Sequence, residues 1–411
     1  MATFAALSEK NYQKFIAGFG ISYILYWVTL LAVGWWTWEV THSATWVSFM
    51  FFCDLFPALL ITPFASSFAD KGDRFVILRV VLLIQVITGS VLSLTAYLGA
   101  LTPGILAAFI FLEGALIGVS QPAFFGLVNR LVSEENLSSA VAFISSLVQT
   151  TYIVGPLVAS LVFSLGIEFA WLALGANAFG TAIYLLFLAS LTLRTIKQSS
   201  ISPLAPTTIG GALDGLRIFV TDKTVYQASV VIIVFAIIQR PLLNLLPAIN
   251  GEYSVVDAAY FTILTASFML GSVLSSLYLS HQNNPNGPAT SAVYIIGLLC
   301  LSIALLFLGL ENGLNNIYFA SVMLLVIGFC CSQLMTGSNI VLQNKVPENY
   351  RSRVLGNSFM ITRAFGAVSV VVVGVAIDGY GMYESYIGLA ALSLLLYLLL
   401  CRKKFANDGK R

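Results

Sequence analysis

Long apolar stretches alternate with short polar connectors along this chain, and one connector is densely charged. Residues 46–68 contain one charged residue, Asp54, and residues 76–98 contain only Arg79. Between them lies Ala69-Asp70-Lys71-Gly72-Asp73-Arg74-Phe75. About 20 helical residues cross a hydrocarbon core of roughly 30 Å, so each apolar stretch is long enough to span a membrane. The charged segment is then a tight connector between two spans.

Composition agrees with a membrane protein and excludes several other classes. The 411 residues are 58% hydrophobic and 9% charged, whereas soluble proteins are about one quarter charged. The net charge of +2 argues against nucleic acid as a partner. The five cysteines lie in or beside apolar stretches, and the two histidines lie far apart, so we expect no disulfide framework and no metal site. The sequence has no P-loop and no Gly-x-Ser-x-Gly motif, so we expect neither an enzyme nor a cofactor.

Breaks at glycine, proline and charged residues predict an all-α membrane protein with twelve transmembrane helices in two six-helix bundles. The predicted helices are residues 15–37, 44–66, 76–98, 104–128, 138–164 and 168–192 in the first bundle, and residues 224–248, 256–280, 289–309, 315–342, 353–377 and 382–401 in the second. We expect the first bundle to occupy residues 1–193, a polar linker residues 194–223, and the second bundle residues 224–411.

The distribution of basic residues predicts the orientation. Eighteen of the twenty Lys and Arg residues lie at the termini or at the helix ends and connectors of one face. The other two, Arg240 and Arg363, lie inside predicted helices, and the connectors of the opposite face carry acidic residues instead. Lys and Arg accumulate on the cytoplasmic side of membrane proteins, so we expect both termini in the cytoplasm.

Several motifs then resemble one transporter family. The segment Leu127-Val-Asn-Arg-Leu-Val-Ser-Glu-Glu-Asn136 resembles Leu342-Gln-Asn-Lys-Val-Pro-Glu-Asn349, and both follow the fourth helix of a six-helix half. Parallel six-helix repeats are the architecture of major facilitator transporters. The connector 69–75 is similar to the signature of that superfamily, in the form typical of the branch with the enterobactin exporter and the macrolide efflux proteins. Glu39-Val-Thr-His-Ser43 and Val346-Pro-Glu-Asn-Tyr-Arg-Ser-Arg-Val354 also resemble segments of this branch.

The resemblance implies a cytoplasmic gate, with some departures from the family pattern. Its expected members are Asp70, Lys71, Asp73, Arg74, Arg351 and Arg353, with Asp70 near the positive end of a neighbouring helix dipole. The alternative is that these charges only fix the topology. Ser66 stands where the signature begins with glycine, and the helix 5 antiporter motif keeps only Gly155-Pro156, which weakens a strict antiporter assignment.

Charged residues at membrane depth are costly unless they are paired or face a cavity, so each is a candidate functional residue. Asp54 and Glu113 are predicted about 15 Å and 14 Å into their helices, and we expect them to be the proton-coupling residues. The predicted substrate-binding residues are Arg240, Arg363, Glu113, Gln149, Gln121, Tyr26, Trp27 and Asn244, and Gln85 adds a further polar group. The alternative is structural: the acids pair with the arginines, and the polar and aromatic residues only pack or form hydrogen bonds between helices.

The two arginines suggest an anionic substrate, because guanidinium groups bind carboxylates through paired N–H donors. By analogy with the siderophore exporters of the branch, we expect a monomeric, proton-driven exporter of a small carboxylate-type siderophore in a bacterial cytoplasmic (inner) membrane. A multidrug or macrolide efflux pump is the main alternative, and a lipid flippase is a further one.

Overall fold

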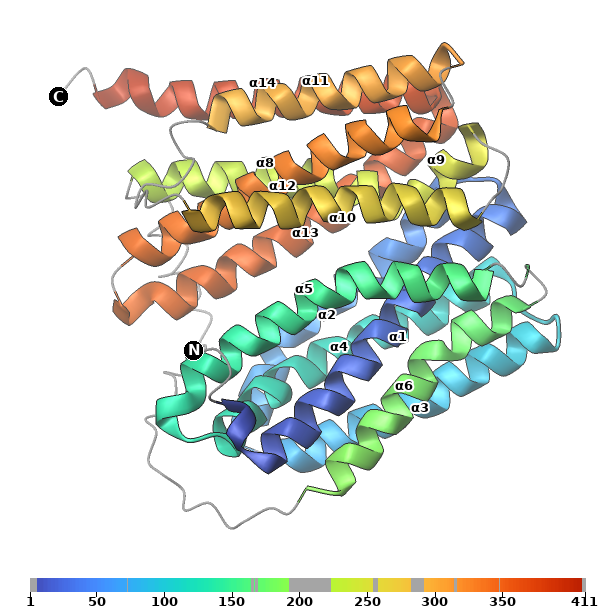
Figure 1. The fold of residues 1–411 in the computed structure, drawn as a ribbon, viewed down its shortest axis with the longest axis vertical. Coiled ribbons are helices and arrows are strands. Elements are labelled where there is room, and N and C mark those ends of the chain that lie inside the picture. Colours follow the sequence, from blue (N-terminus) through green and yellow to red (C-terminus); the bar gives the residue numbers. More distant parts are fainter. Residues whose placement is uncertain are drawn as a thin grey trace. The chain divides into compact units, whose positions relative to one another are not determined.

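In the computed structural model, helices dominate the residues that are described: 6–71, 73–163, 166, 169–191, 223–253, 258–281, 292–313, 316–346 and 348–408 (Figure 1). The predicted linker falls almost entirely in 192–222, outside the described residues, so the linker and the bundle boundaries stay predictions.

Each of the twelve predicted ranges overlaps one long helix. The first half contains α1 (Lys10–Thr41), α2 (Ala44–Lys71), α3 (Arg74–Tyr97), α4 (Pro103–Leu131), the 3-10 helix η2 (Glu134–Asn136), α5 (Leu137–Phe163) and α6 (Ala170–Ala189). The second half contains α8 (Lys223–Asn244), α9 (Leu246–Tyr253), α10 (Ala258–His281), α11 (Ala292–Glu311), α12 (Ile317–Lys345), α13 (Glu348–Tyr380) and α14 (Met382–Asp408). The seventh predicted helix is divided, because α8 ends at Asn244 and the short α9 follows it.

Ten of the described helices are long and apolar enough to cross a membrane, and the apolar stretches in α5 and α10 are shorter. The helix α3 illustrates the pattern: Leu83, Ile87 and Leu94 are exposed, while Leu78 and Leu82 are buried. An exposed apolar stripe of this length is favourable in lipid and unfavourable in water. The chain is therefore a multi-pass membrane protein.

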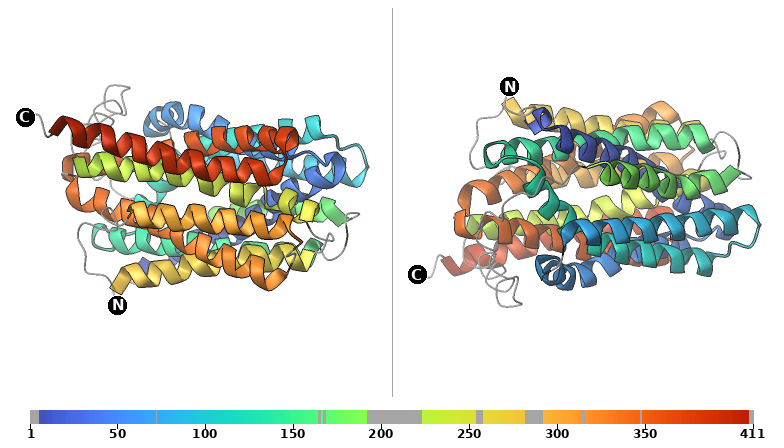
Figure 2. Two further views of the ribbon diagram at one scale, coloured as in Figure 1. Left: turned by 90° about the horizontal axis from the view of Figure 1, so that it is seen from above. Right: turned by 90° about the horizontal axis from the view of Figure 1, so that it is seen from below.

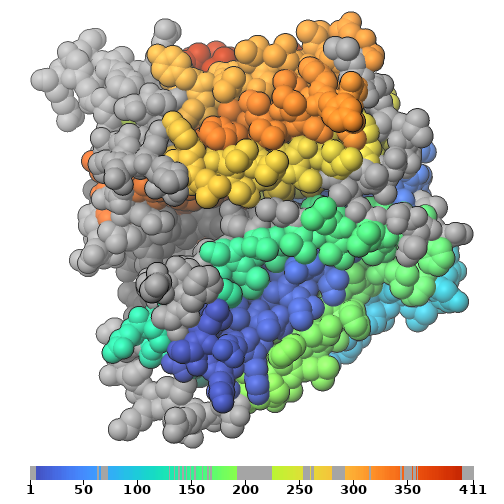
Figure 3. Space-filling model, viewed as in Figure 1, coloured from blue at the N-terminus to red at the C-terminus, as the bar shows by residue number. Residues whose placement is uncertain are grey.

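Contacts divide the chain into two compact units. The first unit contains Met1–Val40 and Cys53–Thr207, and the second contains Thr41–Phe52 and Thr208–Arg411. The helix α2 thus contributes its first turns to the second unit and the rest to the first. Within each unit, the long helices run side by side in roughly a common direction (Figure 2), and α10, α11 and α12 cover one face of the second unit (Figure 3).

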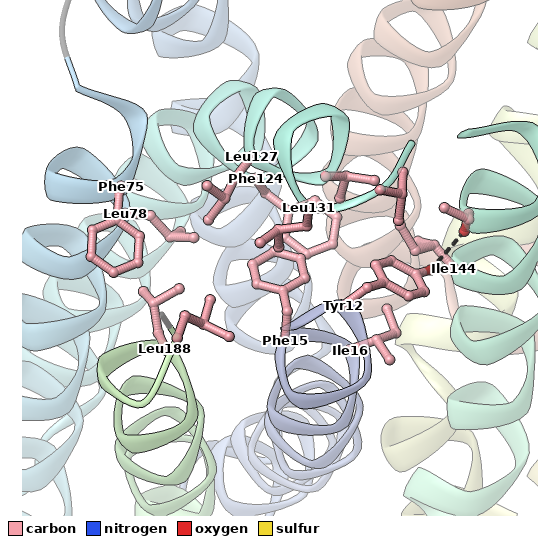
Figure 4. Close-up of a cluster of buried hydrophobic side chains, with 14 of the residues drawn as sticks. Tyr12, Phe15, Ile16, Phe75, Leu78, Phe124, Leu127, Leu131, Ile144 and Leu188 are labelled. Carbon is pink, nitrogen blue, oxygen red and sulfur yellow. Dashed lines mark hydrogen bonds between the residues drawn. The ribbon is translucent and has the colours of Figure 1, made fainter. Parts of the chain in front are cut away.

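An aromatic and aliphatic core holds one end of the first unit together (Figure 4). Phe15 of α1 stacks on Phe124 of α4, with ring centroids 5.1 Å apart, and Leu78 of α3 and Leu188 of α6 are buried in the same cluster. The buried Tyr12 hydroxyl donates a hydrogen bond to the Ala140 carbonyl at 2.9 Å. This core joins α1 to α3, α4, α5 and α6 and so fixes the helices that carry the polar site described next.

Candidate functional site

The first unit brings its two predicted proton-coupling acids to one helix crossing. At this crossing α4 lies directly against α2, because a Cβ on Gly114 would lie 2.8 Å from the Cys53 carbonyl oxygen and would overlap that of Asp54. Glu113 precedes this glycine, and its carboxyl group interacts electrostatically with Asp54. Only glycine permits so close an approach of two helix backbones. Gly114 therefore determines how near the two carboxyl groups lie.

Asp54 is held by the first helix. It is 8% exposed, and the Tyr26 hydroxyl lies 3.0 Å and 3.1 Å from its two carboxyl oxygens, as a hydrogen-bond donor. Tyr26 continues an aromatic stack along α1, with centroid distances of 5.7 Å to Tyr23 and 5.3 Å from Tyr23 to Phe19. Tyr26, predicted as a substrate-binding residue, thus contacts one of the two acids, and its role in substrate binding stays a prediction.

Glu113 is contacted by two amide side chains from other helices. Its Oε1 accepts a hydrogen bond from Asn177 Nδ2 of α6 at 2.6 Å, and Gln85 of α3 also interacts with the carboxyl group. Its Oε2 is buried and has no hydrogen-bond partner of regular geometry among the described residues. A buried polar atom without a partner is costly, so this oxygen is suited to gain a proton or a ligand.

The electrostatic setting favours proton exchange. Lys and Arg residues on the described helices of this unit lie within the first or last two turns, away from Asp54 and Glu113. Two carboxyl groups close together in an apolar bundle repel each other strongly when both are ionised. The site can therefore take up and release a proton as its surroundings change.

Other predicted residues of the first unit lie apart from this pair or outside the described atoms. The side chain of Trp27 packs on α5, because a Cβ on Gly155 would overlap the Trp27 Cβ. Gln121 lies eight residues after Glu113 on α4, which corresponds to about 12 Å along the helix. The side chain of Gln149 is not among those described. These three residues stay predictions.

Asn177 was missed by the sequence analysis. It is a single asparagine in an apolar span, 7% exposed, and it contacts Glu113 directly. A polar residue inside a span needs a partner, and this selected the charged residues. An uncharged amide such as that of Asn177 also needs a partner, but it is a weaker signal than a charge.

In the second unit, the predicted residues Arg240, Asn244 and Arg363 lie in one neighbourhood. A Cβ on Gly366 of α13 would lie 2.6 Å from Arg240 Cγ, so the side chain of Arg240 lies flat against α13. Arg363 is one turn before Gly366 on α13, and Asn244 is one turn after Arg240 on α8. Arg240 Nε is buried and has no hydrogen-bond partner among the described residues. Two arginines therefore lie on neighbouring helices, within about one turn of the same level.

The predicted gate is only partly described. Asp73 caps α3, with its side chain accepting a hydrogen bond from the Phe75 amide at 2.9 Å, and Arg74 donates to the Gly126 carbonyl of α4 at 3.3 Å. Both residues thus have local structural roles in the first unit. The side chains of Asp70, Lys71, Arg351 and Arg353 are not among those described, so the gate stays a prediction.

With this geometry established, comparison with known proteins decides the family. The family model described as "Transmembrane secretion effector" matches residues 1–407, nearly the whole chain. The chain belongs to this family. Its relatives and structural neighbours are major facilitator transporters, so this protein is a transporter of that superfamily and not an enzyme.

Curated relatives align over almost the full length. The staphyloferrin A transporter of Staphylococcus aureus (strain NCTC 8325 / PS 47) is 20% identical, covering 94% of this chain and 96% of the relative. Macrolide efflux protein A of Streptococcus pyogenes is 22% identical, covering 94% and 93%. The multidrug efflux pump Tap of Mycolicibacterium fortuitum is 23% identical, covering 90% of each chain.

Solved structures confirm the fold. A bacterial homologue of the human lysosomal transporter Spinster matches with a TM-score of 0.77 at 13% identity, covering 96% of this chain and 98% of that one. A bacterial homologue of the iron transporter ferroportin matches with a TM-score of 0.70 at 13% identity, covering 95% and 98%. The predicted major facilitator fold is thus confirmed.

Proposed function

We propose that this protein is a proton-driven efflux transporter that exports a small carboxylate-type siderophore by alternating access. It works as a monomer in the cytoplasmic (inner) membrane of a bacterium, with both termini in the cytoplasm. The relatives already place it among efflux transporters. The observation that carries the choice of substrate is the placement of Arg240 and Arg363 on neighbouring helices of the second unit, inside spans.

Arginine chemistry supports an anionic substrate. A guanidinium group presents paired N–H donors that match the two oxygens of a carboxylate. The Nε of Arg240 is buried and has no hydrogen-bond partner in the described part of the chain, which leaves a donor that a carboxylate ligand can satisfy. A polycarboxylate offers one carboxylate to Arg240 and another to Arg363. The likeness to the staphyloferrin A transporter, a protein named for a siderophore, agrees with this choice.

Glu113 and Asp54 supply the coupling in this proposal. Export against a gradient needs an energy source, and a carboxyl group that binds a proton in one state and releases it in another provides one. The Oε2 of Glu113 has no hydrogen-bond partner of regular geometry among the described residues, so it is a place where the proton can bind, and the Tyr26 hydroxyl holds Asp54 beside it. Substrate and proton then bind to separate polar regions, one in each compact unit.

A macrolide or multidrug efflux pump is the second candidate, and two observations favour it. Two of the relatives named above carry such activities in their names. The aromatic stack of Phe19, Tyr23 and Tyr26 offers ring faces to a large apolar molecule or to a cation. In that case the arginines are structural and Glu113 is the residue that binds the drug cation or the proton.

Transport into proteoliposomes with an imposed pH gradient distinguishes the candidates. We expect gradient-dependent movement of a labelled citrate-type siderophore and none of a labelled macrolide. Arg363→Ala should reduce siderophore transport about tenfold or more, since one charge-assisted contact to the substrate is lost. Arg79→Ala is the matched control, because Arg79 lies over the Phe75 ring near the start of α3, in the first unit, and should leave transport unchanged.

The proposed substrate would be overturned if only the macrolide moved. It would also be overturned if Arg363→Ala transported the siderophore at the wild-type rate, with equal amounts of protein in the membrane. Equal loss in the Arg79 and Arg363 variants would point to a general effect of removing a positive charge and would count against a substrate contact.

A further inference from the structure

We propose that Asn177 is a positioning residue for Glu113 and that the Thr29 hydroxyl holds Asn177 in place. A reversible hydrogen-bond relay then runs from Asn177 through Thr181 to Ser22. Through this relay, a change in the protonation of Glu113 on α4 changes the hydrogen bonding of Ser22 on α1. This inference rests on the proposed function, because it assumes that Glu113 is the group that takes up the proton.

The first observation is a hydroxyl group of α1 that contacts the backbone of α6. Thr29 Oγ1 of α1 donates a hydrogen bond to the Ala173 carbonyl at 2.9 Å and accepts one from the Asn177 backbone N–H at 2.9 Å. In a regular α-helix, this N–H and this carbonyl are hydrogen-bonded directly to each other. The Thr29 hydroxyl therefore bonds to both members of a backbone pair of α6. Thr29 thereby fixes the backbone of Asn177.

The Thr29 hydrogen bonds depend on close contact between α1 and α6. A Cβ on Gly180 would lie 3.0 Å from both Leu25 Cβ and Ser22 Cα, so the two helices meet with little space between them. Thr29 lies about two turns along α1 from Ser22, and Ala173 lies about two turns along α6 from Gly180. The glycine contact and the Thr29 hydrogen bonds therefore set the same register of the two helices.

The second observation is a chain of polar side chains that ends at the acid. Asn177 Nδ2 donates to Glu113 Oε1 at 2.6 Å, while its Oδ1 accepts from Thr181 Oγ1 at 3.3 Å. Thr181 Oγ1 lies 3.2 Å from Ser22 Oγ, and either hydroxyl can be the donor. Three helices are thus connected, α4 through Glu113, α6 through Asn177 and Thr181, and α1 through Ser22.

The donors and acceptors in this series of hydrogen bonds can exchange roles when Glu113 is protonated or ionised. An ionised Glu113 only accepts hydrogen bonds, so it faces the amide nitrogen of Asn177. A protonated Glu113 carries an O–H that donates, and a half-turn of the amide then presents Oδ1 to it and Nδ2 to Thr181 Oγ1. Thr181 in turn donates to Ser22. The number of hydrogen bonds is the same in both states, and the only atom gained is the proton on Glu113.

Other groups near Glu113 do not replace this relay. Asp54 of α2 is the titratable group that interacts with it, Tyr26 of α1 donates to Asp54, and Gln85 of α3 contributes a neutral amide. Asn177 differs from Gln85 in being tied to two further hydroxyl groups of α6 and α1. Its replacement therefore affects both the proton site and the connection to α1.

The test compares two transport modes of the full protein in proteoliposomes, with siderophore as the labelled substrate. Exchange at equal pH on both sides needs no net proton transfer, whereas gradient-driven transport does. For Asn177→Leu we expect near-normal exchange, gradient-driven transport reduced about tenfold, and a pH of half-maximal transport raised by about one unit, because a donor to the ionised carboxylate is lost.

Thr29→Val should give the same change in smaller degree, and Thr29→Ser should restore the wild-type profile, because serine keeps the hydroxyl. Thr88→Val on α3 is the control, since among the described residues the Thr88 hydroxyl bonds only to carbonyls of its own helix. The Thr29 pair also covers the case in which Asn177→Leu does not fold.

Three outcomes overturn the relay. One is a wild-type pH profile for Asn177→Leu or for Thr29→Val. Another is an equal loss of exchange and driven transport, with no shift in the pH profile, in both variants, which indicates a packing role. The third is a Thr29→Ser variant no better than Thr29→Val. Glu113→Gln separates the two proposals: if it loses the gradient response while Asn177→Leu keeps it, only the relay fails, and if Glu113→Gln keeps it, the proposed proton site fails as well.

Discussion

Glycines lie where α2 crosses α4 in the first unit and where α10 crosses α12 in the second, yet the two crossings carry different side chains. In the first unit, Gly114 of α4 meets the backbone of α2 at Asp54. In the second unit, a Cβ on Gly328 of α12 would lie 2.8 Å from the Phe268 carbonyl carbon of α10 and would overlap its oxygen, and Gly271 of α10 meets α12 in the same way. The backbone contact is thus repeated in the two units.

The polar groups at the two crossings differ in their chemistry. In the second unit, Ser272 Oγ lies 3.2 Å from the Gly328 carbonyl, and Ser276 Oγ lies 3.3 Å from Ser332 Oγ. Small hydroxyl groups are therefore sufficient to support a glycine crossing. The first unit instead places Asp54 and Glu113 at its crossing, although buried carboxyl groups cost far more than serines. The acids are not required for the crossing, which supports their assignment to proton coupling.

The largest effect is expected from disrupting the close backbone contact between α10 and α12. In Gly328→Leu the new side chain overlaps the α10 backbone, and overpacking of this kind costs about 1–3 kcal/mol or more. We expect little monodisperse protein after extraction in detergent. Gly297→Leu on α11 is the matched control, because a Cβ there would meet nothing within 4 Å. A normal yield of the Gly328 variant would show that the close crossing is not needed for folding.

The next effect separates the chemistry of the first crossing from its structure. Glu113→Gln keeps the shape and the acceptor for Asn177 Nδ2 but cannot exchange a proton. We expect a yield and melting temperature close to wild type and a loss of response to the pH gradient, measured as siderophore transport with and without the gradient. Ser276→Ala, at the second crossing, should leave the response intact. A gradient response equal to wild type in the Glu113 variant would remove the functional distinction between the crossings.

The sequence was sufficient for the fold because span length, composition and charge asymmetry are local properties of a chain in a membrane. Each of the twelve predicted ranges overlaps a long helix for this reason. The polar site was only partly predictable. Asp54, Glu113 and Arg240 are recognisable because a charge inside a span needs an explanation. Asn177 and Thr29 are not, because their roles depend on how α1 and α6 are rotated and on a hydroxyl that bonds to backbone groups.

The smallest effect is expected at the start of α2. The first turns of α2 belong to the second unit, where Asp378 of α13 accepts hydrogen bonds from the backbone N–H groups of Ala44 and Thr45, at 2.8 Å and 3.0 Å, and from the Ser43 hydroxyl. A carboxylate in this place satisfies free N–H groups at the start of a helix and interacts favourably with the helix dipole.

Asp378→Ala removes this cap and should cost about 1 kcal/mol, or about 2 °C in melting temperature for a chain of this size. Asp378→Asn keeps one side-chain acceptor and should lose about half as much, which distinguishes the cap from a packing effect. Both values are measured by thermal unfolding in detergent at neutral pH, where the carboxylate is ionised. If both variants melt at the wild-type temperature, Asp378 of α13 does not stabilise the start of α2 in detergent. The cap would then not distinguish α2 from α10.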